Sequence, residues 1–218
     1  FDSKAYYLGW FIGDGCLAQN ACKFAFRKDV AEIRKILTRC GIPFKEKPNK
    51  RGDTTFRYSV YDSKWLFDLG FKNGYKAKTV SIPEKYQFNK WTIRGLFEAE
   101  GSSCNKGPSE GRIVLDMCSK ECVSQISLYL LSIGIKHTIR SYGRKNPKHN
   151  DRHRIGIYGE DVERFQRIVG CSLYRKQVNR KVKLKHKLKP LVRMDKIKKI
   201  TPVGVRELYD ISLDSEDN

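Results

Sequence analysis

The chain has 218 residues, 39% of them hydrophobic, so it is long and apolar enough to fold around a core. Its 44 lysine and arginine residues stand against 24 acidic residues, and the net charge of +20 predicts a polyanionic partner. The sequence has no apolar run long enough for a membrane span and no signal-peptide pattern, so we expect neither a membrane protein nor a secreted one.

The first predicted element is an apolar helix in YYLGWFIGDG, residues 6–15. Its single charge, Asp14, lies at the C-terminal tip, where the helix dipole is negative and disfavours an anion. An acid in this place requires a nearby cation. A second copy, IRGLFEAEG at residues 93–101, ends in the same way, with Glu100 followed by glycine. Two copies at this separation predict a duplicated unit that is larger than a solenoid repeat.

Each copy leads into a similar series of elements. After the first copy we expect a strand at 22–28, a helix at 28–42, strands around 44–47 and 56–61, and a short helix at 62–71. After the second we expect a strand at 112–119, a helix at 120–135, strands around 136–142 and 154–158, and a helix at 159–170. The repeated order αββαββα predicts an α+β protein, a pseudo-symmetric duplication with helices on one face of each antiparallel sheet.

Small residues recur at helical spacing in both copies: Gly9 and Gly13 in the first, Gly95 and Ala99 in the second. Such residues let two helix backbones approach closely, so we expect the two opening helices to pack together. Side-by-side packing would bring Asp14 and Glu100 to the same end. The alternative is that the small residues serve packing only and that the two acids are exposed at their helix ends.

The predicted strands have one apolar face and one polar face. The polar face carries hydrogen-bond donors, cations and aromatic rings, and its charge is nearly all positive, which suits contacts with phosphates and base edges of DNA. The candidate DNA-binding residues are Lys23, Arg27, Lys28, Arg57, Ser59, Tyr61, Arg112, Arg140, Arg154 and Tyr158.

Cysteine usage favours a reduced, intracellular protein, because the 7 cysteines are odd in number and form no C-x-x-C pair. His149 and His153 have H-x3-H spacing, but no cysteine pair precedes them, so a zinc site is the weaker alternative. Attachment to a membrane surface is a second alternative, without an amphipathic basic helix to support it. The chain begins at Phe1 and not at methionine, so we expect a piece of a longer protein.

The two motifs YLGWFIGDG (7–15) and IRGLFEAEG (93–101) resemble the signatures of LAGLIDADG homing endonucleases in their single-chain, two-repeat form. The resemblance covers the duplication, residues 1 to about 185. Ile12 stands where an acid is common, and Glu98 and Glu100 stand where aspartate is more usual. Glutamate also serves at the catalytic position in this family, so Glu100 is not expected to inactivate the protein.

The resemblance implies that the motif helices pair at the centre and that two saddle-shaped sheets cover a long, asymmetric double-stranded DNA target. Asp14 and Glu100 would hold divalent metal against the scissile phosphates, and the Gly13 and Ala99 carbonyls would add ligands, since terminal helix carbonyls lack partners. Mg²⁺ is the expected ion. Mn²⁺ is expected to substitute, whereas Ca²⁺ should bind without supporting efficient cleavage. The reaction would be metal-dependent hydrolysis that makes a double-strand break, performed by a monomer.

The family also places a lysine near each active site. In GFKNGYKAKTVSIPEKY, residues 70–86, Lys76 is the first candidate and Lys78 the second. In the second half Arg175 or Lys176 is the counterpart, and we take Lys176 as catalytic with Lys76. The alternative for any one of these lysines is a plain phosphate contact.

We expect three parts: a first half with linker at 1–90, a second half at 91–185, and a basic extension at 186–218. Within the extension, LYDI at 208–211 resembles a strand of an intein's splicing domain, which indicates an intein-type lineage and a site in a prokaryotic cytoplasm or an organelle. An extra strand or a disordered end is the alternative there. For the whole chain, the alternative function is a cleavage-inactive DNA- or RNA-binding relative, either a maturase or a regulator.

Overall fold

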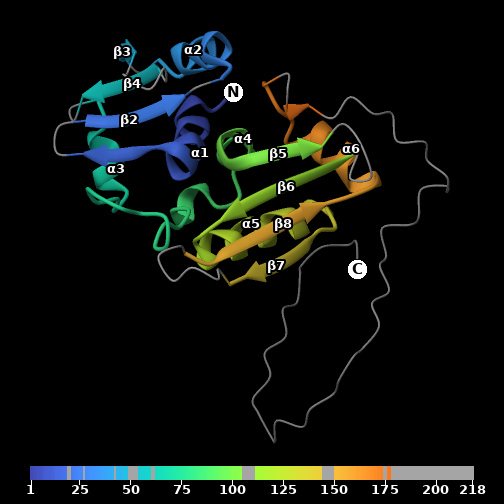
Figure 1. Cartoon of the computed structure of the whole chain (residues 1–218). Coiled ribbons are helices and arrows are strands. Elements are labelled where there is room, and N and C mark those ends of the chain that lie inside the picture. Colours follow the sequence, from blue (N-terminus) through green and yellow to red (C-terminus); the bar gives the residue numbers. More distant parts are fainter. Residues whose placement is uncertain are drawn as a thin grey trace, which may run out of the picture. The chain divides into compact units, whose positions relative to one another are not determined.

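A computed structural model describes residues 1–18, 21–26, 28–41, 43–48, 54–59, 62–104, 111–143, 150–173 and 176–177 (Figure 1). These residues all fall within one compact unit, residues 1–185. The extension at 186–218 lies outside the described residues, as does its LYDI segment.

The described elements repeat one order twice. The first half consists of α1 (Ser3–Asp14), β1 (Cys16–Ala18), β2 (Ala21–Phe26), α2 (Val30–Arg39), β3 (Lys45–Pro48), β4 (Thr54–Ser59) and α3 (Lys64–Asp68). A 3-10 turn, η1 (Glu84–Tyr86), precedes the second half. The second half consists of α4 (Lys90–Glu100), β5 (Gly101–Cys104), β6 (Arg112–Met117), α5 (Lys120–Ser132), β7 (Thr138–Tyr142), β8 (Arg152–Ile157) and α6 (Glu160–Ile168). The predicted α+β class and αββαββα order are confirmed.

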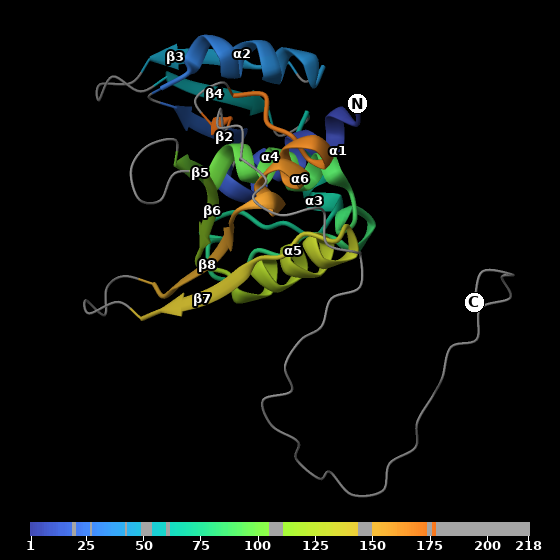
Figure 2. The same ribbon diagram turned by 90° about the vertical axis from the view of Figure 1, so that its right-hand side faces the viewer.

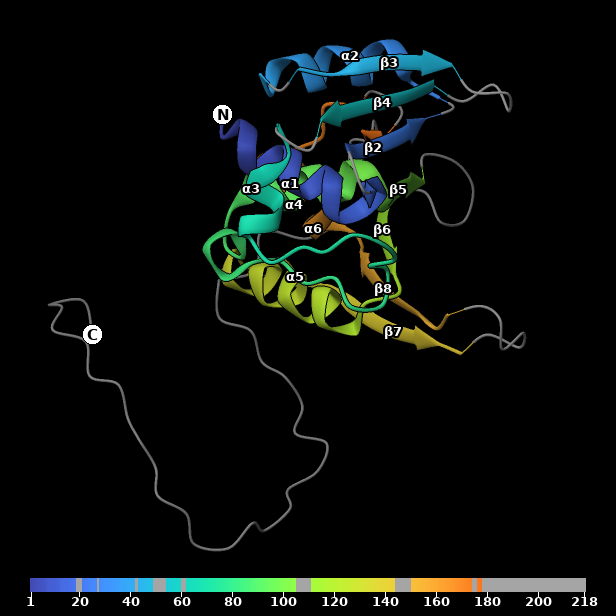
Figure 3. The same ribbon diagram turned by 90° about the vertical axis from the view of Figure 1, so that its left-hand side faces the viewer.

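Each half contains one antiparallel four-stranded sheet, with strand orders β1-β2-β4-β3 and β5-β6-β8-β7. The inner strands pair over their whole length in the first sheet, in the register Phe24↔Phe56, and over all but one residue of each strand in the second, in the register Leu115↔Ile155. Figures 2 and 3 show α4, α5 and α6 on the same side of the second sheet. The other face of that sheet is left without a covering helix among the described elements.

The inward faces of the strands are apolar, as their alternation predicts. Phe24 of β2 and Tyr58 of β4 are buried and pack edge to face, with ring centroids 5.8 Å apart. Tyr7 of α1 packs on Phe24 in the same way at 5.5 Å. Edge-to-face aromatic pairs stabilise a core beyond their buried area. The first sheet is thereby fixed against α1.

Helices α1 and α4 pack directly against each other because glycine removes the side chains between them. A Cβ atom on Gly9 would lie 2.1 Å from the Thr92 carbonyl oxygen, and one on Gly95 would lie 2.2 Å from the Tyr6 carbonyl oxygen. Real Cβ atoms do not approach backbone oxygens so closely, so any larger residue would push the helices apart. The predicted close packing of the two motif helices is present in the structure.

The two helices are also aligned along their axes. Asp2 caps α1 by accepting from the Ala5 N–H at 3.0 Å, and Asn89 caps α4 by accepting from the Trp91 N–H at 2.9 Å. The Asn89 side chain donates to Asp2 Oδ2 at 2.9 Å, which ties the two caps together. Because α1 has 12 residues and α4 has 11, their C-terminal tips also come together.

Candidate active site at the paired helix tips

Both helices end in an acid followed by glycine, and both glycines turn the chain sharply into a strand. The Gly15 N–H donates to the Phe11 carbonyl, and the Gly101 N–H donates to the Phe97 carbonyl. A Cβ atom at Gly15 would lie 2.8 Å from the Phe11 oxygen, so the turn has no room for a side chain. The adjacent carboxylates, Asp14 and Glu100, therefore stand at the last helical position, solvent-exposed.

Two lysines close the C-terminal ends of the helices. Lys76 Nζ donates to the Ile12 carbonyl oxygen at 2.8 Å and to the Gly13 oxygen at 3.3 Å. Lys176 Nζ donates to the Glu98 oxygen and to the Ala99 oxygen, the latter at 3.0 Å. Cations are stabilising at the negative end of a helix dipole, and these carbonyls have no partner within the helix. Each motif helix is thus ended by its own ammonium group.

The charges of this cluster act on one another. Burial lowers the pKa of Lys76, and the charges of Glu100 and Asp14 oppose that change. Partial burial and the neighbouring charge of Asp14 raise the pKa of Glu100, whereas Lys76, Lys176 and Arg152 oppose the rise. The two acids therefore repel each other in the absence of a cation between them.

Each acid shares a cavity with the tip of the opposite helix. We call the first the Glu100 cavity: it measures about 550 Å³, and Gly13, Lys76, Asp116 and Arg152 also line it. The second, the Asp14 cavity, measures about 250 Å³. Its lining includes Lys28, Glu98, Ala99 and Leu173. Asp14 of α1 thus lies beside the tip of α4, and Glu100 of α4 lies beside the tip of α1. Each half of the site therefore combines a carboxylate from one motif with the terminal carbonyls of the other.

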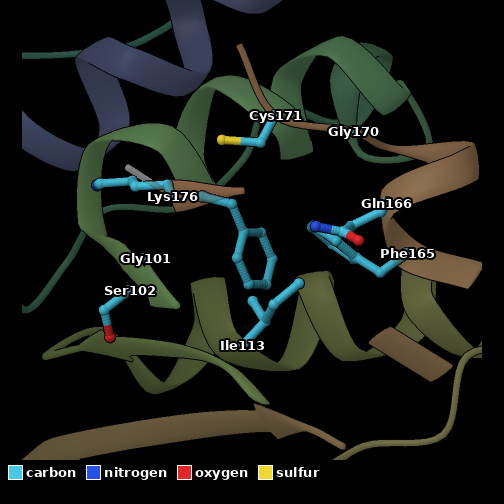
Figure 4. A pocket seen from close by; sticks show the side chains of 9 residues that line it. Gly101, Ser102, Ile113, Phe165, Gln166, Gly170, Cys171 and Lys176 are labelled. Atoms are coloured by element: carbon cyan, nitrogen blue, oxygen red, sulfur yellow. The ribbon is translucent and has the colours of Figure 1, made fainter. Parts of the chain in front are cut away.

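Lys176 is 8% exposed, and its stem lies against a small gap of about 20 Å³ (Figure 4). Phe97, Ile113 and Phe165 provide the apolar walls of that gap. A space of this size holds about one water molecule. The space is therefore a packing gap and not a ligand pocket. Its apolar walls hold the lysine stem in place.

The first sheet presents cations on the face turned away from its aromatic core. Lys23 and Arg57 are direct partners across β2 and β4, and Lys45 of β3 pairs with Arg57 from the other side. Ser59 lies on the same face and donates to Asp62. Lys28 is exposed in the turn after β2. The other two candidates of this half, Arg27 and Tyr61, lie outside the described residues.

The second sheet carries one acid among the cations of its polar face. Arg140 and Arg154 are partners across β7 and β8, and Arg112 and Tyr158 lie on the same side by alternation. Asp116 of β6 is also there, opposite Arg154, which donates to both of its carboxylate oxygens at 2.8 Å. The face that was expected to be nearly all positive or neutral therefore includes one acid in this sheet. Its alternation places an acid on the polar face.

Three features of the site were missed by the sequence reasoning. Lys45 and Lys47 extend the basic face of the first sheet, but β3 is exposed throughout and gives no period-two apolar signal. Arg152 lines the Glu100 cavity, and its Nη2 lies 3.7 Å from Asp116 Oδ2. Glu98 is 1% exposed and was noted only as a departure from the usual motif residue. A charged residue inside an otherwise apolar motif was the available signal for it.

The donor set at the tips suits a hard cation. Within the described ranges no cluster of three or more histidine, cysteine, aspartate or glutamate side chains could hold a metal by itself. Two carboxylates with terminal carbonyls leave most positions to water and phosphate oxygens, which is how Mg²⁺ is usually bound. The carbonyls of Gly13 and Ala99 already accept from lysines, and each keeps a second lone pair.

The described cysteines and one histidine of the H-x3-H pair can be located. The six cysteines whose side chains are described, Cys16, Cys22, Cys40, Cys118, Cys122 and Cys171, are free thiols. His153 makes a hydrogen bond with Ser141 Oγ at 2.8 Å, and His149 lies outside the described residues. Among the described helices, none is both long and apolar enough to cross a membrane.

The structure defines a class of protein: two αββαββα halves joined through a close helix pair whose tips carry one acid and one lysine each. Residues 87–170 match the family of LAGLIDADG-like domains. The homing endonuclease I-WcaI, bound to its DNA recognition sequence, is similar with a TM-score of 0.51 and 20% identity, over 77% of this chain and 80% of that one. Residues 87–170 thus match a LAGLIDADG-like domain, and the chain is similar in fold to this homing endonuclease.

Two further proteins are similar to this chain, one in structure and one in sequence. The N-terminal LAGLIDADG domain of DUF199/WhiA is similar with a TM-score of 0.54 and 15% identity, over 84% of each chain. The replication factor C small subunit of Thermococcus kodakarensis is 29% identical over 198 residues, which are 87% of this chain and 22% of that protein. The chain thus spans about a fifth of the length of that relative.

Proposed function

We propose that the protein is a site-specific DNA endonuclease that cuts both strands of a long, asymmetric duplex by metal-dependent phosphodiester hydrolysis, acting as a monomer. The observation that carries this proposal is the crossed arrangement at the helix tips. Asp14 shares a cavity with Ala99, and Glu100 shares one with Gly13 and Lys76. Two sites at one interface, each with one carboxylate and the terminal carbonyls of the other helix, suit two scissile phosphates. A pure binding surface gains nothing from two carboxylates that face phosphate.

DNA binding would use the polar faces of the two sheets. Lys23, Lys45 and Arg57 form a basic row across the first sheet and would neutralise backbone phosphates. Arg140 and Arg154 lie in the corresponding place on the second sheet. Since Arg154 already pairs with Asp116, the second sheet offers fewer uncommitted cations, and contacts to base edges would matter more there.

At the tips, Asp14 and Glu100 would hold Mg²⁺, or Mn²⁺ in its place. When bound, such an ion would lower the pKa of water and offset negative charge on the phosphate oxygens. Burial lowers the pKa of Lys76, and the charges of Glu100 and Asp14 oppose that fall. From the helix end Lys76 would stabilise negative charge on the phosphate. Lys176 would act in the same way beside Ala99.

An intein-type mobile element is the proposed origin. The similarity to about a fifth of a replication factor C small subunit supports it, because a segment of this length then stands inside a longer protein. The resemblance of the LYDI segment to an intein strand points the same way.

The decisive experiment incubates the protein and Mg²⁺ with a duplex library that carries a randomised segment, followed by sequencing of the cleaved ends. We expect a single long consensus, with no product from the Asp14→Asn variant and normal product from Glu46→Gln. Glu46 is a suitable control because it pairs with Arg34 on the surface, away from the tips. Tight, sequence-specific binding without any Mg²⁺- or Mn²⁺-dependent cleavage would instead establish a cleavage-inactive relative.

A further inference from the structure

Glu98 is a buried acid beneath the tip of α4, and three donors surround it. The Tyr6 hydroxyl donates to Oε2, while Arg94 Nε at 3.1 Å and the Ser172 N–H both donate to Oε1. Burial and then the charge of Glu98 raise the pKa of the Tyr6 hydroxyl far above its usual value, so this group remains a donor. A carboxylate at this depth is retained only when it is paired and hydrogen-bonded, and both conditions hold here.

These contacts anchor the segment that delivers Lys176. Arg94 Nη2 also donates to Ser172 Oγ at 2.7 Å, so Ser172 is held at its backbone and at its side chain. Leu173 is fully buried, and its carbonyl accepts from the Lys176 N–H at 2.9 Å. The ammonium group then returns to the Glu98 and Ala99 carbonyls. The Glu98 side chain thus holds Ser172 at the start of this segment, and the Glu98 carbonyl accepts a hydrogen bond from the Lys176 ammonium group at its end.

Among the described residues of the first half, no buried carboxylate plays this part. Ile12 stands at the position that matches Glu98, and it is buried and apolar. Lys76 is placed instead by its own turn, in which the Val80 N–H donates to the Lys76 carbonyl at 2.8 Å. Its ammonium group lies 5.3 Å from the centroid of the Phe11 ring. The two lysines therefore reach matching places by different means.

We infer that Glu98 is a positioning residue that holds Lys176 against the terminal carbonyls of α4, and that the two halves of the site are consequently inequivalent. One half depends on a buried carboxylate and the other does not. Because the consequence for strand cleavage rests on the proposed endonuclease function, the inference requires one measurement that is independent of cleavage and one that follows each strand.

The first measurement is the rate of lysine acetylation by acetic anhydride in metal-free buffer, followed residue by residue by mass spectrometry. In Glu98→Gln, acetylation of Lys176 should rise by about tenfold or more, because the segment that buries it opens more often. Lys76 should be unchanged, and Glu46→Gln should leave both lysines as they are in the parent protein. Unchanged protection of Lys176, or an equal rise at Lys76, would overturn the inference without bearing on the endonuclease proposal.

The second measurement follows each strand of a duplex that carries the selected target, labelled separately. A misplaced group near the reaction costs up to about 10²-fold, so Glu98→Gln should slow one strand by that order and leave the other within about twofold, giving a nicked product. Lys176→Met should slow the same strand, and the double variant should be no worse than Lys176→Met alone. Equal slowing of both strands indicates a merely structural role and contradicts the inference.

Folding of the variants is checked by thermal denaturation. Should Glu98→Gln fail to fold, Arg94→Gln replaces it, because Arg94 is a partner of both Glu98 and Ser172 and its side chain is 20% exposed. The same increase in Lys176 acetylation and the same strand asymmetry are expected from it. If the parent protein cuts neither strand, the endonuclease proposal fails, and the acetylation result still decides whether Glu98 positions Lys176.

Discussion

Lys76 Nζ donates to the Ile12 carbonyl oxygen 2.8 Å away, and so a half-buried lysine closes the helix whose last residue is Asp14. The sequence required a cation near Asp14, and this ammonium group provides one before any metal binds. The same relationship is repeated by Lys176 at the end of α4.

Replacement of Lys76 by methionine should therefore reduce cleavage much more than binding. The variant loses a cation beside Glu100 and Asp14 but keeps the sheet faces intact, so we expect a loss of cleavage rate of about 10²-fold. Lys78→Met is the matched control, because Lys78 is exposed in the same turn. Equal losses in the two variants would make Lys76 a plain phosphate contact.

Metal dependence should separate binding from cutting. Asp14→Asn or Glu100→Gln should abolish double-strand cleavage and leave the dissociation constant for DNA within about tenfold, since each change removes a metal-binding group and little sheet surface. Ca²⁺ should support a stable complex with slow or no cleavage, because it fills oxygen sites but activates water poorly. Gel shifts and cleavage assays on the selected duplex measure both quantities. Cleavage that survives EDTA, or rapid cleavage in Ca²⁺, would refute the metal mechanism.

The helix interface should not tolerate even a methyl group. A Cβ atom on Gly9 would lie 2.1 Å from the Thr92 oxygen, so Gly9→Ala should destabilise the fold by about 1–3 kcal/mol, and Gly9→Leu or Gly95→Leu by at least as much. Thermal or denaturant unfolding measures the change. Gly143→Ala is the matched control, since its nearest neighbour is 3.9 Å from the added atom. An unchanged melting temperature in Gly9→Ala would mean that the two helices do not pack in this way.

DNA affinity should fall steeply with salt. A surface that neutralises about 6–10 phosphates loses about 10³–10⁵ in affinity between about 50 and 200 mM salt. The basic row of Lys23, Lys45 and Arg57, together with the arginines of the second sheet, could contact that many phosphates. Replacement of Lys45 by alanine should lower the slope of log K against log salt by about one. Titrations at several salt concentrations give the slope, and a flat response would exclude a nucleic-acid partner.

Stability in metal-free buffer should depend on pH through Glu100. Because partial burial and Asp14 raise its pKa in the folded state, the folded protein is stabilised while Glu100 is protonated and loses that stability as pH rises through the raised pKa. The melting temperature of Glu100→Gln minus that of the parent should therefore increase as the pH rises above the usual pKa of a glutamate. Mg²⁺ at neutral pH should reduce this difference.

Glu46 gives a control of opposite sign for that experiment. Its hydrogen bonds from Arg34 lower its pKa, so its contribution is present above the usual pKa of a glutamate and is lost as pH falls. Glu46→Gln should accordingly have a small deficit at neutral pH that disappears in acid. A pH-independent difference between Glu100→Gln and the parent would contradict the raised pKa of Glu100.

The sequence by itself determined the fold class and the two motif helices. Apolar residues alternate with period two in the strands, as at Phe24 and Phe26. Small residues at helical spacing, such as Gly9 and Gly95, predict that the two motif helices pack closely. These signals are local, because propensity and periodicity act over a few neighbouring residues. Family resemblance alone predicts a catalytic role for Lys76. Its position at the helix tip depends on a turn that the sequence does not specify.

Only the tertiary structure decided which groups share a cavity. The crossing of Asp14 to Ala99 and of Glu100 to Gly13 depends on how two backbones pack, and the pairing of Asp116 with Arg154 depends on strand register. Glu98 reads in the sequence as a second motif acid, yet its partners Tyr6 and Ser172 come from distant segments. Long-range contacts of this kind carry no periodic signature, because each one is set by the packing of elements that are far apart along the chain.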